Sequence, residues 1–202
     1  MEPDMQTEFV AARERFRYAT PDDLPAIVGM LQEEAVGRWL FFLPAPVAAL
    51  EAYLGPLIEA QGRELGEGSL PAGATFVVED LEGGFLGMAA ALGVDGSPGG
   101  FEIGYQLAEA SWGRGVGTRS ARFVAAWAVY LQQAYRLEAS LLAGNEASRK
   151  ILSGVGLVEE GRRPGYRLKD GVRHTQLLYG AVIDEALRAR LAPDARQAGL
   201  LT

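Results

Sequence analysis

The segment Trp112-Gly113-Arg114-Gly115-Val116-Gly117-Thr118 lies between an apolar strand-like run and a long amphipathic helix-like run. Three glycines at alternate positions remove side chains from the turn that leads into the helix. Backbone N–H groups could then surround an anion at the positive end of the helix dipole. A phosphate group is the anion that this pattern favours, so the segment predicts a site for a phosphorylated ligand.

Two familiar phosphate-binding motifs do not fit this segment. A Walker A loop requires lysine directly after its last glycine, and Thr118 follows Gly117 here. A Rossmann turn requires its first glycine directly after a strand and an acidic residue at the end of the next strand. Here residues 108–112 intervene, and Glu138 lies inside its predicted strand. A tight connection that needs positive φ would also explain the glycines.

A second motif narrows the choice. Residues 145–157 read Asn-Glu-Ala-Ser-Arg-Lys-Ile-Leu-Ser-Gly-Val-Gly-Leu. This run resembles the Asn-x-x-Ser-x-x-x-Leu-x-x-x-Gly-Phe signature of the RimJ/RimL-like branch of the GNAT superfamily. Residues 112–117 resemble that family's pyrophosphate loop, Gln/Arg-x-x-Gly-x-Gly/Ala, with Trp112 as a departure at the first position. The resemblance extends from about Phe16 to Val182 and implies an acetyl-CoA-dependent N-acetyltransferase.

Composition limits the other function classes. The 202 residues are expected to form one domain, with residues 1–14 as an N-terminal arm and 184–202 as a C-terminal extension. The chain has no cysteine and only one histidine, His174, so we expect no metal. A net charge of −7 argues against a nucleic-acid partner. There is no apolar run of the roughly 20 residues that span a bilayer, and no signal-peptide core, so we expect no membrane association and a cytoplasmic location.

Hydrophobic periodicity and turn residues predict an α+β fold. The predicted strands cover residues 15–19, 75–78, 84–92, 101–107, 136–143, 157–160, 166–168 and 175–182. The predicted helices begin near Thr20 and Asn145 and cover residues 47–65, 116–134 and 184–191. The resemblance implies the GNAT fold, a central mixed, mostly antiparallel twisted sheet flanked by helices. It also implies a splay between the fourth and fifth strands, 101–107 and 136–143.

The resemblance also implies which residues hold the coenzyme. Main-chain N–H groups of Arg114, Gly115, Val116, Gly117 and Thr118 would surround the pyrophosphate, and Arg119 would meet the 3′-phosphate. Free backbone groups near Gln106 and Leu107 would pair with the pantetheine arm and the thioester carbonyl. Asn145 would contact the same arm, although capping its own helix also explains this residue.

Glu102 and Ser148 are the candidate catalytic residues. The resemblance places a general base on the central strand, where Glu102 lies, although a surface glutamate is the alternative interpretation. Ser148 is the candidate general acid, since Leu152 stands where other branches carry a tyrosine. A water or another residue is the alternative acid, and a water relay the alternative base.

The predicted reaction is direct attack by a primary amine, in a ternary complex, on the acetyl group of acetyl-CoA. The acceptor is a small molecule or a peptide N-terminus. Residues 38–46 are expected to border the acceptor cleft and could also form a homodimer contact. Because Trp112 and Leu152 depart from catalytic patterns, a non-catalytic acyl-CoA-binding or sensor domain is the alternative function.

Overall fold

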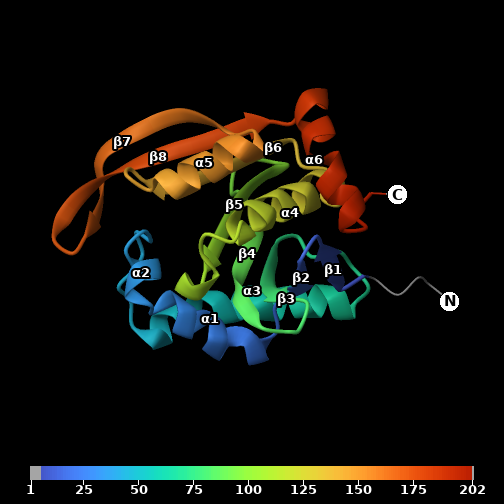
Figure 1. Ribbon diagram of the computed structural model, residues 1–202, viewed down its shortest axis with the longest axis horizontal. Helices are drawn as coiled ribbons and strands as arrows, with labels where there is room; N and C mark the ends of the chain where they lie inside the picture. The colour runs from blue at the N-terminus through green and yellow to red at the C-terminus, as the bar shows by residue number, and fades with distance from the viewer. Residues whose placement is uncertain (1–5, 202) are drawn as a thin grey trace.

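The computed structural model describes residues 6–201 and is built around one eight-stranded sheet (Figure 1). The sheet order is β1-β2-β3-β4-β5-β6-β8-β7, and only β5 and β6 run parallel. The strand bounds are β1 Glu8–Ala11, β2 Glu14–Tyr18, β3 Ala74–Asp80, β4 Phe85–Gly93, β5 Gly100–Leu107, β6 Arg136–Leu142, β7 Val158–Lys169 and β8 Val172–Val182. This sheet confirms the predicted α+β class and its mixed, mostly antiparallel character.

The sheet is split between β5 and β6. These strands are in register only at three positions, Gly100↔Arg136, Phe101↔Leu137 and Glu102↔Glu138. Beyond Glu102, β5 keeps pairing with β4 on its other side, as far as Leu107 opposite Gly87. One edge of β5 therefore carries backbone groups that no neighbouring strand pairs. The predicted splay is confirmed at these two strands.

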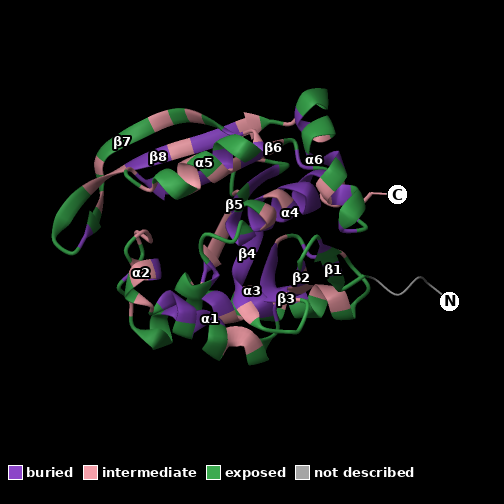
Figure 2. Ribbon diagram, in the orientation of Figure 1, coloured by how far each residue is buried: buried purple, intermediate pink, exposed green. Residues whose placement is uncertain are grey.

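Helices cover both faces of the sheet. On one face lie α4 (Val116–Tyr130), α5 (Glu146–Val155) and α6 (Glu185–Gln197), which share a hydrophobic core. The other face carries α1 (Leu24–Leu31) and α3 (Val47–Gly66) around a second core. Short helices occur as η1 (Pro21–Asp23), α2 (Glu34–Gly37) and η2 (Glu109–Ser111). Figure 2 shows the buried residues concentrated in the central strands and α4, as expected for a sheet enclosed between two helical layers.

An aromatic cluster fixes α4 on the sheet. Phe16 stacks on Phe123 with ring centroids 4.0 Å apart, and Phe76 contacts the ring of Trp127 edge-on. The Trp127 indole Nε1 donates a hydrogen bond to the Tyr18 hydroxyl at 3.0 Å. Aromatic pairs of this kind add to the free energy gained by burying their area. They hold the first turn of α4 in a defined place at the end of β5.

The predicted N-terminal arm was wrong for the residues that the structure describes. Residues 8–11 form β1, which pairs with β2 and places Phe9, 1% exposed, in the larger core. The β1–β2 turn uses Ala12 at φ 60°, a conformation that glycine or asparagine normally supplies. The sequence therefore carried no turn signal there. Residues 1–5 of the predicted arm lie outside the described residues.

Three further boundaries differ from the sequence prediction. Helix α4 ends at Tyr130 because the chain reverses at Gln133 (φ 56°) and cannot continue to residue 134. Helix α6 continues through Pro193, which forfeits one backbone hydrogen bond but lies between the buried Leu191 and Ala195. Two long strands, β7 and β8, replace the three short late strands. Pro164 is tolerated in β7 because this strand forms the edge of the sheet.

The C-terminal extension belongs to the same folded unit. Helix α6 packs on α4 and reaches β1, so the two ends of the described chain lie close together (Figure 1). Within residues 6–201, no helix is long and apolar enough to cross a bilayer.

Candidate active site

The glycine turn has the backbone conformation that its sequence predicts. Gly113 and Gly115 have φ values of 72° and 78°, in the left-handed region that favours glycine, and Gly115 caps the start of α4. A β carbon on Gly115 would lie 2.6 Å from Nη1 of Arg119, and one on Gly117 would lie 3.1 Å from Cδ1 of Ile151. The positive φ favours glycine at position 115, a side chain at 117 would crowd Ile151, and the first turn of α4 presents bare main chain.

A cavity of about 400 Å³ lies against this turn. Seven of the nine predicted coenzyme residues line it: Gln106, Leu107, Gly115, Val116, Gly117, Thr118 and Asn145. The positive end of the α4 dipole and the free first N–H groups of the helix lie beside this space. The structure thus brings residues from β5, α4 and the start of α5 to one site.

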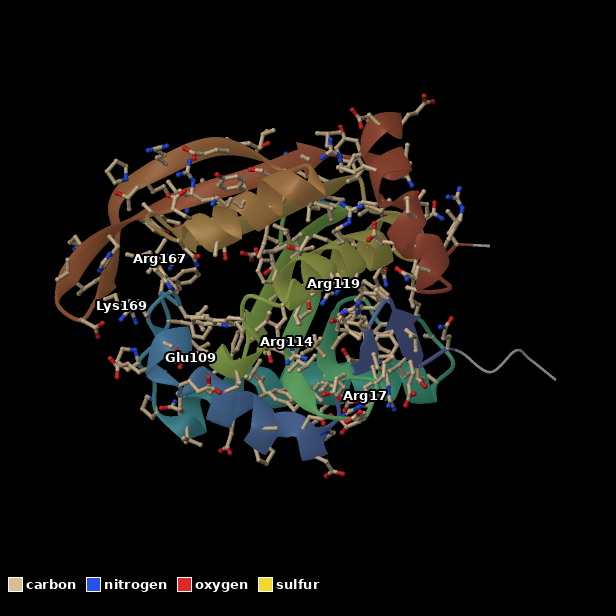
Figure 3. All side chains as sticks on the ribbon, in the orientation of Figure 1. Arg17, Glu109, Arg114, Arg119, Arg167 and Lys169 are labelled. Atoms are coloured by element: carbon tan, nitrogen blue, oxygen red, sulfur yellow. The ribbon has the colours of Figure 1, made fainter. Side chains whose placement is uncertain are left out.

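Arg114 and Arg119 do not line this cavity. The Arg119 guanidinium is bound to Glu14, with Nε to Oε2 at 2.5 Å and Nη2 to Oε1 at 2.6 Å. Its Nη2 also donates to the Arg114 carbonyl oxygen at 2.9 Å. Arg119 thus makes an internal contact that ties the glycine turn to β2 (Figure 3), and its contact with the 3′-phosphate stays a prediction.

Trp112 has a structural role at the position where the family motif carries Gln or Arg. Its indole Nε1 donates to the Leu107 carbonyl oxygen at 3.0 Å. The Ala108 N–H pairs with the Leu86 carbonyl oxygen. Backbone groups at the end of β5 thus make hydrogen bonds within the protein. The Leu107 carbonyl oxygen, which was expected to be free, accepts one of them.

A second, larger cavity of about 980 Å³ lies on the other side of β5. Its wall includes Glu102 on β5 and, from the predicted acceptor-side segment, Trp39, Phe41 and Phe42. Helix α3, strand β6 and the β7–β8 hairpin complete the wall. The hairpin is joined to the acceptor-side segment, because the buried Lys169 Nζ donates to the Leu43 carbonyl oxygen.

The two cavities share six lining residues: Trp39, Leu40, Tyr105, Gln106, Asn145 and Ser148. A ligand in the smaller cavity would therefore meet a ligand in the larger one beside Tyr105 and Ser148. The Asn145 side-chain oxygen accepts the Ser148 N–H at 3.2 Å, which caps α5 and fixes the first turn that carries Ser148. Leu152 is buried one turn later and has no proton to donate.

Comparison with known proteins identifies the family. The model of the acetyltransferase (GNAT) domain matches residues 13–158. The chain belongs to the GNAT acetyltransferase family. It is 25% identical over 166 residues to the Bacillus subtilis (strain 168) protein named "Putative ribosomal N-acetyltransferase YdaF", which covers 81% of this chain and 87% of that protein.

Solved structures share the GNAT fold. The ribosomal-protein-S5-alanine acetyltransferase of Vibrio fischeri has a TM-score of 0.73 and 20% identity, and the match covers 89% of this chain and 98% of that one. RimJ of Mycobacterium smegmatis, solved with a CoA disulfide, has a TM-score of 0.72 and 22% identity over 97% and 98% of the two chains. The predicted GNAT fold is confirmed, and the names of these relatives agree with the predicted RimJ/RimL-like branch.

Glu102 of this GNAT site lies where the splay begins, at the last β5 position that pairs with β6. It is exposed to the larger cavity, and its Oε1 accepts the Ser140 hydroxyl at 3.4 Å. Partial loss of water raises the pKa of Glu102, the Glu138 carboxylate adds to that rise, and Ser140 and Arg167 oppose it. A carboxylate with a raised pKa is a better proton acceptor near neutral pH.

Tyr105 is a residue of the site that the sequence analysis missed. Its hydroxyl is buried and has no hydrogen-bond partner among the described residues. Burial raises its pKa to about 12, and the nearby Ser148 hydroxyl only partly offsets this, without the geometry of a hydrogen bond. The phenol therefore keeps its proton at neutral pH. Its sequence context, an aromatic residue in an apolar strand, is that of any core position.

Within residues 6–201, no three His, Cys, Asp or Glu side chains are grouped to hold a metal ion. The arrangement offers main-chain donors at one end, two hydroxyl groups in the middle and a carboxylate at the other end. These groups are suited to acyl transfer between two ligands that meet at Tyr105 and Ser148.

Proposed function

We propose that the protein transfers the acetyl group of acetyl-CoA to a primary amine in a ternary complex. The observation that carries this proposal is the meeting of the two cavities at Tyr105 and Ser148. One cavity ends in bare main chain at the start of α4, and the other holds Glu102. The names of two similar structures, RimL with coenzyme A and RimJ with a CoA disulfide, support the choice of coenzyme.

The smaller cavity fits the coenzyme by its chemistry. The main-chain N–H groups of residues 115–118 suit a pyrophosphate, because they combine unpaired donors with the helix dipole. Gln106 and Asn145 offer amide groups to the arm that leads toward the splay. When bound, acetyl-CoA supplies an acyl group activated as a thioester.

Glu102 would remove a proton from the acceptor ammonium, directly or through a water. The free amine then forms a C–N bond to the acetyl carbon as the C–S bond breaks. Ser148 or Tyr105 would give a proton to the departing sulfur, and the second proton lost by the acylated nitrogen would restore that hydroxyl, directly or through a water. An α-amine, with a pKa near 8, is about one-tenth neutral at pH 7, whereas a lysine amine near 10.4 costs roughly 3 kcal/mol more to deprotonate. The site is therefore better matched to an α-amine.

We infer that the acceptor is the N-terminal amine of a protein, with a ribosomal protein as the first candidate. This inference rests on the names of the YdaF relative and of the S5-alanine and L7/L12 acetyltransferase structures. Such an acceptor agrees with the predicted cytoplasmic location. Small-molecule amines are the second class to test, because one GNAT fold serves both.

A screen of acceptors tests the proposal. Purified protein and acetyl-CoA are mixed with ribosomal-protein N-terminal peptides, amino acids, polyamines and aminoglycosides, and both free thiol and acetylated product are measured. We expect product with at least one peptide. The Glu102→Gln variant should lose most of the rate and retain acetyl-CoA binding.

Glu138→Gln is the matched control, because Glu138 is the register partner of Glu102 in the same cavity wall. It should keep most of the activity and shift the acidic limb of the pH–rate profile to lower pH, because the Glu138 carboxylate contributes to the raised pKa of Glu102. Stabilisation of the protein by acetyl-CoA without product from any acceptor would instead support the non-catalytic acyl-CoA-binding alternative. No binding of acetyl-CoA would refute both.

A further inference from the structure

The larger cavity has unneutralised charge of both signs in its wall. Arg136 is neutralised there, since it pairs with Glu160 and lies 3.5 Å from Glu138. Among residues 6–201, Glu102 has no arginine or lysine within ion-pair distance, and Arg163 and Arg167 have no aspartate or glutamate within that distance. A carboxylate therefore stands on β5, and two free guanidinium groups stand on β7.

Arg167 is held in place but makes no polar contact. Its guanidinium carbon lies 3.8 Å from the centre of the Phe41 ring and 5.0 Å from that of Tyr166. Its Nε is buried and has no partner within the described chain. A stacked guanidinium uses its faces and leaves its in-plane N–H groups available. Arg167 is thus oriented in advance with its hydrogen-bonding edge unused (Figure 3).

A second buried polar group lies on the same wall. Gln176 of β8 is 2% exposed, and its Oε1 has no hydrogen-bond partner within residues 6–201. It is the register partner of Arg163, and Arg167 pairs with His174, two positions nearer the start of β8. Leaving such groups unpaired costs free energy, so a wall with two of them is better explained if a ligand completes it.

We propose that the acceptor carries a carboxylate close to its amine, and that Arg167 is the residue that selects it. The amine would lie at Glu102, the carboxylate at Arg167 with Arg163 beside it, and a backbone N–H of the acceptor at the Gln176 oxygen. Glu102 and Arg167 line the same cavity, so one acceptor could reach both. An N-terminal peptide with aspartate or glutamate soon after its first residue fits all three groups. This inference rests on the function proposed above.

Matched acceptors test the inference. Each peptide with Asp or Glu at its second or third residue is compared with its Asn or Gln counterpart, and free amino acids are compared with their amides. Wild-type protein should favour the acidic peptides about 10- to 100-fold in kcat/KM, mainly through KM, as expected for a charged bidentate contact. A preference for free amino acids over their amides, without one among peptides, would place the carboxylate on a small molecule.

Variants separate Arg167 from general charge effects. Arg167→Gln should remove the preference, measured as the ratio of kcat/KM between each acidic peptide and its neutral counterpart. Arg167→Lys should restore part of it, because lysine keeps the charge without the planar fork. The control is Arg162→Gln, which removes an exposed arginine of the same strand that pairs with Glu159 outside the cavity. It should behave as the wild type.

A binding measurement gives a readout that is independent of turnover. The Nα-acetylated acidic peptide should quench or shift the fluorescence of Trp39, which lines both cavities, more strongly than its amide counterpart. Arg167→Gln should abolish the difference. If the wild type acetylates acidic and neutral acceptors equally, or if Arg167→Gln keeps the preference, the inference is wrong while the proposed function stands. Absence of turnover with every acceptor would refute both.

Discussion

Replacement of Arg119 by methionine should destabilise the protein by leaving Glu14 as an unpaired carboxylate. The Glu14 side chain is only 3% exposed, whereas that of Arg119 is 29% exposed. Removing one partner of a fully buried pair costs about 3–5 kcal/mol. Because solvent reaches Arg119, we expect a loss of about 2 kcal/mol, which lowers Tm by about 4–8 °C for a domain of this size.

A double-mutant cycle measured by thermal and urea unfolding checks this value. Glu14→Met in the Arg119→Met background removes the stranded charge, so the double variant should be more stable than Arg119→Met alone. Arg13→Met, which removes an exposed arginine next to Glu14, should leave Tm within about 1 °C.

The same variant decides between the internal role of Arg119 and the phosphate contact that its sequence position predicts. If Arg119 has only an internal role, Arg119→Met should weaken the binding of acetyl-CoA and of acetyl-dephospho-CoA by the same factor. An unchanged Tm, together with a loss of discrimination between these two ligands, would refute the reasoning and restore the 3′-phosphate contact.

Four further predictions concern the site. As pH is lowered through the raised pKa of Glu102, which lies above the ordinary glutamate value near 4.3, the rate should fall. The pH–rate profile of Glu102→Gln should lack this acidic limb. Because a raised folded-state pKa penalises the ionised native state, Glu102→Gln should unfold at higher temperature than wild type at pH 7, with the difference vanishing below the unfolded pKa. Of Tyr105→Phe and Ser148→Ala, the variant that removes the general acid should lower the single-turnover rate about 10-fold or more. If both variants keep the wild-type rate, a water molecule protonates the sulfur. Gly115→Ala should weaken acetyl-CoA binding, measured by calorimetry, because alanine at this left-handed φ costs about 1 kcal/mol or more. Gly62→Ala on α3, where a β carbon meets nothing within 4 Å, should leave the binding unchanged.

The parts of the site that depend on backbone shape were predictable from the sequence. Alternating glycines at residues 113–117 predict a left-handed turn and a bare helix start, because glycine adopts positive φ without strain and carries no side chain. Asn145 predicts a cap three residues before a serine, and the structure has that hydrogen bond. Apolar periodicity located the central strands and α4 within a few residues.

What the sequence could not predict are partners far apart in the chain. The ion pair between Arg119 and Glu14 could not be predicted, because Glu14 is 105 residues away and carries no local signal of its approach. Tyr105 and Arg167 look like a core aromatic and a strand arginine until the fold surrounds them with a cavity. Hairpin β1–β2 was missed because an alanine makes its turn. Local patterns report torsion angles and burial, whereas contacts across the sheet require the assembled structure.

Strands β5 and β6 pair at only three register positions, so the sheet consists of two halves joined by a short contact. A molecule wedged between them would contact both halves and resist their separation. Ligand at 100 times its Kd would then contribute about 2.7 kcal/mol, enough to raise the melting point by roughly 5–10 °C. The melting temperature should therefore rise with the concentration of a coenzyme bound there, and the ligand-free protein should be the form that unfolds and is proteolysed most readily.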